Sequence, residues 1–84
     1  MLDQIVRALA ELLASIDLAS DEEIDSDFAA TLQGEVANVF DSLSVHDRAR
    51  LAEIIAHAAE REQARERREA LAEIPQAYGL RDND

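Results

Sequence analysis

Residues 43–73 constrain the fold most, because this stretch contains neither glycine nor proline and opens with a signal for a helix start. Ser44, with Asp47 three residues later, is typical of a helix N-terminus, where a serine hydroxyl accepts a hydrogen bond from the backbone. Apolar residues then recur at helical spacing as far as Ala59, whereas residues 60–69 are almost wholly charged. We therefore predict a helix over residues 45–73 that can pack along its first half only.

Two further helices are predicted upstream, over residues 2–17 and 21–42. The second opens with a capping box, in which Ser20 and Glu23 bond to each other's backbone amides. A later start at Ser26 is the alternative, because Asp25 belongs to a second plausible cap. The first helix is predicted from apolar residues at spacings of three and four, namely Leu2, Ile5, Val6, Leu9, Leu12, Leu13 and Ile16.

Together these elements predict an all-α fold, a small antiparallel three-helix bundle. A chain of 84 residues without cysteine and with few aromatic residues should form one domain, residues 1–84, with a small core of Leu, Ile, Val and Ala. Pro75 disfavours helical geometry at Ile74, so the third helix should end near Glu73. Residues 74–84 are then predicted to be a C-terminal tail.

The predicted third helix is too long for its neighbours to cover. A continuous helix over residues 45–73 would measure about 43 Å, against about 23 Å for the first helix. Either it overhangs the bundle or it breaks near residues 60–65 and folds back. An overhanging end would need a second copy of the chain to cover its apolar residues. We therefore predict a homodimer whose self-association site is Leu71, Ile74, Tyr78 and Leu80.

The net charge of −11 is distributed unevenly along the chain. Residues 1–47 hold eleven acids and one arginine, whereas residues 48–73 hold six of each. A field of this kind repels nucleic acid and anionic membranes and speeds the encounter with basic partners. We predict a basic protein partner, and the candidate contacts are Asp21, Glu22, Glu23, Asp25 and Asp27.

No residue set in this sequence points to enzyme chemistry. The chain has no glycine-rich phosphate loop, no nucleophile elbow and no lysine. The acids between Asp21 and Asp27 match the first ligand positions of a calcium loop, but Ser26 replaces the required glycine and Leu32 the bidentate glutamate. We predict a non-enzymatic protein without catalytic residues, cofactor or metal site.

Nucleic-acid binding is the weakest alternative. It would rest on Arg61, Arg65, Arg67 and Arg68, but glutamates alternate with these arginines and cancel their field. No apolar run reaches the roughly 18 residues that a membrane span needs. The N-terminus also lacks a basic targeting segment. We predict a cytoplasmic protein that does not bind membranes.

Residues 43–54 read Leu-Ser-Val-His-Asp-Arg-Ala-Arg-Leu-Ala-Glu-Ile. This phrase resembles the capped helix Leu-Ser-x-x-acid-Arg-x-x-Leu of some small antitoxins from bacterial addiction modules. In size and acidity the chain also resembles bacteriocin immunity proteins, small helical bundles that block basic nucleases. Both resemblances imply an inhibitor of a basic protein. A self-associating structural or adaptor module is the alternative function.

Overall fold

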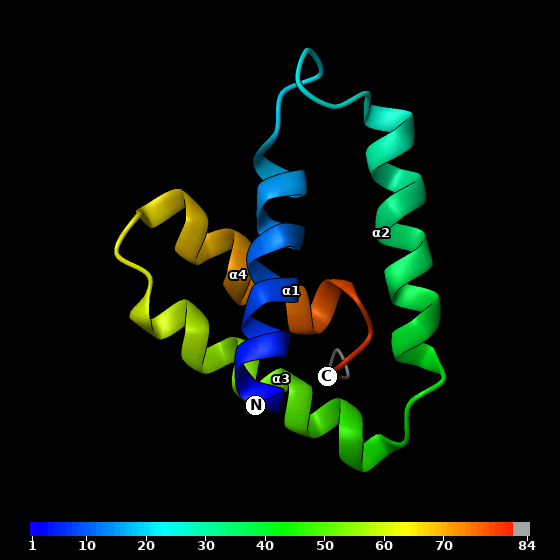
Figure 1. The fold of residues 1–84 in the computed structure, drawn as a ribbon, viewed down its shortest axis with the longest axis vertical. Helices are drawn as coiled ribbons and strands as arrows, with labels where there is room; N and C mark the ends of the chain where they lie inside the picture. Colours follow the sequence, from blue (N-terminus) through cyan, green and yellow to red (C-terminus); the bar gives the residue numbers. More distant parts are fainter. Residues whose placement is uncertain (82–84) are drawn as a thin grey trace.

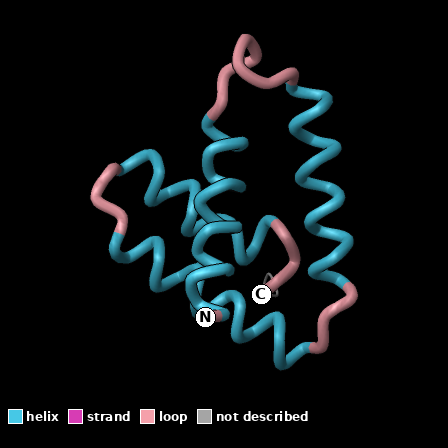
Figure 2. Tube along the Cα trace, viewed as in Figure 1, coloured by secondary structure: helices cyan, strands magenta, loops and turns pink. Residues whose placement is uncertain are grey.

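The computed structural model describes residues 1–81, and within them the chain is all-helical with no strand. Figures 1 and 2 show the helices, joined by short loops. The all-α prediction is therefore confirmed, but the predicted number of helices is wrong, because the described chain has four. They are α1 (Leu2–Leu18), α2 (Ser26–Asp41), α3 (Val45–Arg61) and α4 (Arg65–Ala77).

The predicted third helix breaks in two, as the fold-back alternative required. Glu62 adopts an extended conformation, and its side chain accepts hydrogen bonds from the amides of Gln63 and Ala64 at 2.9 and 3.3 Å. These bonds satisfy backbone donors that a continuous helix would otherwise use. α4 then returns beside α3, and the two helices cross α1 (Figure 1). The longest dimension of the described chain is 38 Å, which is shorter than the roughly 43 Å of a continuous helix over residues 45–73. Within residues 1–81, no helix end therefore overhangs the bundle.

The end of α4 corrects a second expectation. Pro75 does not end the helix, which continues to Ala77 with Pro75 buried inside it. The helix ends instead at a Schellman motif. Gly79 has φ +75°, and its amide donates to the Gln76 carbonyl. The Leu80 amide donates to the Pro75 carbonyl at 2.8 Å. Much of the predicted tail is thus helix and cap. Residues 82–84 lie outside the described residues.

The start of α2 follows the later of the two predicted sites. Ser20 and Glu23 do form the reciprocal capping-box bonds, at 2.9 and 3.3 Å. This box, however, closes a single turn within the α1–α2 loop. α2 itself begins at Ser26, with the Asp25 side chain accepting from the amide of Phe28 at 3.1 Å. The Ser20–Glu23 box therefore caps the turn in the loop, and Asp25 caps α2.

The core lies between α1, α3 and α4, and α2 stands to one side of it. Within Ser26–Asp41 only Phe40 is fully buried, although Val36 also packs against the core. Alanines let the other helices approach closely. The buried apolar residues are Val6, Ala10, Leu13, Ala14, Phe40, Ala52, Ile54, Ile55, Ala58, Ala59, Ala70, Leu71, Ile74 and Leu80.

Candidate functional site

A cavity of about 310 Å³ lies between α1, α2 and α4. It exists because the middle of α2 faces it with Gly34 and Ala37, which are too small to fill the space. A Cβ atom added at Gly34 would meet nothing within 4 Å. The lining comprises Leu13, Asp17, Gln33, Gly34, Ala37, Ala70, Glu73, Ile74, Ala77 and Tyr78.

The charged residues that line this cavity are both acids. Asp17 comes from the last turn of α1, and Glu73 comes from α4. Asp17 and Glu73 are both exposed residues, so their carboxylates are accessible to a partner. The remaining walls are mostly apolar. This combination suits a side chain with an apolar stem and a cationic end.

Tyr78 forms one wall of the cavity and reports on its electrostatics. Its ring meets that of Phe40 edge to face, with the centroids 6.1 Å apart. Burial raises the pKa of the Tyr78 hydroxyl above its ordinary value, the negative charge of Asp17 raises it further, and the side chain of Gln33 opposes the shift. The field of Asp17 therefore reaches into the cavity.

The five acids predicted to bind a partner are all exposed and lie around the α1–α2 loop, at the top of Figure 1. Glu23 and Asp25 are occupied as caps, as described above. Asp21, Glu22 and Asp27 have no hydrogen bond or ion pair from their side chains within residues 1–81. Asp21 and Glu22 of the loop and Asp27 in the first turn of α2 thus present three carboxylates that form no hydrogen bond or ion pair in the described chain.

The predicted self-association residues are placed differently from our expectation. Leu71, Ile74 and Leu80 are only 0%, 3% and 5% exposed, and Tyr78 is half-buried. They pack within their own chain because α4 folds back. The exposed apolar tip that required a second copy does not exist, so a homodimer would need another surface.

Apolar residues elsewhere remain exposed. Leu2, Ile5 and Leu12 of α1 were expected in the core, but Val6, Ala10, Leu13 and Ala14 face it instead. On α2, Phe28 and Val39 are 57% and 61% exposed. The sequence pattern did not separate these sets, because the predicted apolar face of α1 left out Ala10 and Ala14 and is wider than the contact of α1 with the core.

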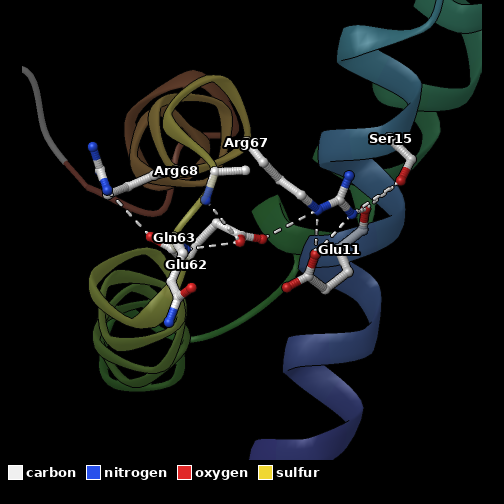
Figure 3. A network of polar contacts seen from close by, with 7 residues as sticks. Glu11, Ser15, Glu62, Gln63, Arg67 and Arg68 are labelled. Atoms are coloured by element: carbon white, nitrogen blue, oxygen red, sulfur yellow. Dashed lines mark hydrogen bonds and ion pairs between the residues drawn. The ribbon is translucent and has the colours of Figure 1, made fainter.

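Most arginines of the arginine-rich segment form ion pairs or hydrogen bonds within their own chain. The Arg67 side chain donates to a Glu11 carboxylate oxygen at 2.7 Å, to the Glu11 carbonyl at 2.8 Å and to the Ser15 hydroxyl at 3.0 Å. Glu62 approaches the same guanidinium at 3.5 Å (Figure 3). Arg65 pairs with Glu69, and Arg68 donates to the Glu62 carbonyl. Arg67 therefore joins α4 to α1 and is not available to a phosphate.

Comparison with known protein families, with curated proteins and with solved structures finds no match. Within residues 1–81, no three His, Asp or Glu side chains are grouped so that they could hold a metal ion. Nor does any helix of that part combine the length and apolar character that a membrane span requires. The resemblances to antitoxins and immunity proteins stay predictions.

Proposed function

We propose that this chain is a non-enzymatic helical module that binds a basic protein. One observation carries the proposal: from Asp17 to Asp47 the chain holds nine acids and no arginine, and within the described residues none of the nine forms an ion pair. Apart from the caps at Glu23 and Asp25, these carboxylates are left for a partner.

The acids would act mainly on the rate and specificity of association. Complementary fields speed encounter and reject partners of the same sign, whereas most affinity comes from buried apolar contacts. The exposed Phe28 lies three residues after Asp25, so an apolar contact is present beside the acidic loop. A basic protein that docks there would meet both kinds of surface.

An inhibitory role is the form of this function that we favour. Carboxylates spaced along a loop resemble a phosphate backbone in charge, so they would occupy a basic site that otherwise takes nucleic acid. The resemblances to antitoxins and immunity proteins imply the same role. The partner would then be a basic nuclease or toxin.

The test is capture of partners from the cell of origin with matched variants. The triple variant Asp21→Asn, Glu22→Gln and Asp27→Asn removes three acids of the loop and leaves both caps in place. Glu53→Gln, Glu60→Gln and Glu66→Gln removes the same charge from the charge-balanced half. We expect basic proteins to be captured by the wild type and the second triple variant, and to be lost from the first. Identical partner lists for all three proteins, or none, would contradict the proposal.

Self-association is the second candidate function, and the exposed apolar residues of α1 and α2 favour it. Leu2, Ile5 and Leu12 share one stripe at helical spacing, and Phe28 and Val39 lie on the neighbouring helix. Sedimentation equilibrium of the wild type and of an Ile5→Gln, Leu12→Gln variant measures this directly. A dimer that the variant weakens would support it, whereas a monomer at high micromolar concentration would exclude it.

A further inference from the structure

We infer that the cavity between α1, α2 and α4 receives one cationic side chain, an arginine or a lysine, from the basic partner. This inference rests on the proposed function and names the place where the partner anchors. The anchor enters between Asp17 of α1 and Glu73 of α4, and its stem lies along the apolar walls.

The size of the cavity favours a single side chain. Sites for small-molecule ligands usually measure about 300 to 1,000 Å³, and this cavity of about 310 Å³ lies at the lower limit. Its walls come from three helices and include Leu13, Ala37, Ala70 and Ile74. The methylene groups of an arginine or lysine would bury apolar area against these walls.

The charge of the cavity selects the occupant. Asp17 and Glu73 approach the same space from different helices, and no arginine lines it. An anion would meet two carboxylates without compensation, and a neutral apolar group would leave them without a partner. A guanidinium has several donors and could bond a carboxylate in bidentate fashion. Gln33 and the Tyr78 hydroxyl supply neutral polar groups beside it.

A second copy of this chain is a poor occupant. Each copy carries a net charge of −11, and the acids around the α1–α2 loop would approach those of the other copy. Of the arginines, Arg67 is held by Glu11 and Ser15, and Arg65 is paired with Glu69. The charge of the surface therefore favours a partner of opposite sign.

The test uses a blocked pentapeptide, acetyl-Ala-Ala-Arg-Ala-Ala-amide, titrated at low salt into the full chain labelled with ¹⁵N. The control peptide carries citrulline in place of arginine, which keeps the shape and removes the charge. We expect saturable amide shifts at Gly34, Ala37, Glu73 and Tyr78 with the arginine peptide, and at least tenfold weaker binding of the citrulline peptide.

Two sets of variants locate the binding. Asp17→Asn with Glu73→Gln removes the cavity carboxylates, whereas Glu53→Gln with Glu60→Gln removes the same charge from exposed sites on α3. Gly34→Leu fills the cavity, and the open space around Gly34 predicts that this variant folds. We expect the first pair and Gly34→Leu to weaken binding at least fivefold and the second pair to leave it within twofold. Circular dichroism confirms that each variant is helical.

Two results would overturn the inference and leave the proposed function standing. One is equal weakening by both pairs of charge variants, which would show a general acidic field. The other is a set of shifts confined to Leu2, Ile5, Leu12, Phe28 and Val39, which would place the contact on the exposed apolar residues. Loss of the captured basic proteins on neutralising the loop acids depends on neither result, so the two proposals can fail separately.

Discussion

The two glycines of this chain occupy opposite situations. Gly79 has φ +75°, which L residues rarely adopt, and it allows the Schellman motif to end α4 and return Leu80 to the core. Gly34 lies inside α2 with a helical backbone and faces open space in the cavity. One glycine serves the backbone, and the other keeps a cavity open.

Substitution of the two glycines by alanine should therefore have opposite effects on stability. Gly34→Ala should raise the free energy of unfolding by about 1 kcal/mol, because alanine loses less backbone entropy in a helix and meets no atom. Gly79→Ala should lower it by about 1 kcal/mol, because alanine is strained at positive φ. Urea unfolding measures both changes. A loss of stability in Gly34→Ala would show that the cavity is closed in solution.

Tyr78 allows the field of the cavity to be measured. It is the only tyrosine and the chain has no tryptophan, so tyrosinate absorbance against pH reports it alone. Because burial and Asp17 raise its pKa, the folded state favours the protonated phenol. That contribution to stability is full below about pH 10, the pKa in the unfolded chain, and is lost as pH rises through the higher pKa of the folded state.

Asp17→Asn should lower the pKa of Tyr78 part of the way toward its ordinary value, because burial is the larger cause. The control Asp27→Asn, exposed on α2, should leave that pKa unchanged. Tyr78→Phe should remove the alkaline loss of stability described above. If Asp17→Asn has no more effect than the control, Asp17 does not face the cavity.

At the scale of elements, the return of α4 toward α1 decides the fold. The Glu62 side chain bonds the amides of the turn, and Arg67 then reaches Glu11 and Ser15 of α1 (Figure 3). The two bonds from Arg67 to Glu11 are partly shielded from water, so each is worth more than an exposed ion pair. The arginine-rich segment is thus a structural joint between α4 and α1.

Arg67→Gln should lower the free energy of unfolding by about 1 to 2 kcal/mol, because it removes charge-assisted bonds and leaves Glu11 without its partner. The matched control is Arg65→Gln, whose exposed pair with Glu69 spans one helical turn and is worth about 0.3 to 0.5 kcal/mol. Chemical unfolding of both variants measures the difference. Equal losses would show that Arg67 does not join the helices in solution.

At the scale of the whole molecule, repulsion among the acids opposes the stabilisation that the small core provides. The chain has a net charge of −11, and most acids of its N-terminal half have no ion pair in residues 1–81. Their mutual repulsion destabilises the compact state and is screened by salt. A bound basic partner would relieve the same repulsion.

The melting temperature should therefore rise as sodium chloride is added from low salt to about 0.15 M, where the screening length is about 8 Å. The triple variant Asp21→Asn, Glu22→Gln and Asp27→Asn should show a smaller rise, because it has less repulsion to screen. A melting temperature that is flat or falls with salt in the wild type would contradict this account.

The sequence by itself determined the helical class and several helix ends, but not the number of helices. Periodicity located α1 to within one residue, and side-chain chemistry located the cap at Ser44, because capping depends on residues that are close in the chain. For the start of α2 it offered Asp25 only as the alternative to Ser20. The uneven distribution of charge along the chain could also be read from the sequence, since counting charges needs no three-dimensional information. The all-α class followed from both composition and period.

Only the tertiary structure decided which apolar residues are covered and where a site lies. Burial of Ile74 and Pro75 outweighed the local tendency of proline to end α4, and the return of α4 buried Leu71 and Leu80 in their own chain. The cavity brings Asp17, Gly34 and Glu73 together from three helices. Such contacts depend on how helices pack against each other, which a pattern of period and charge along one chain does not specify.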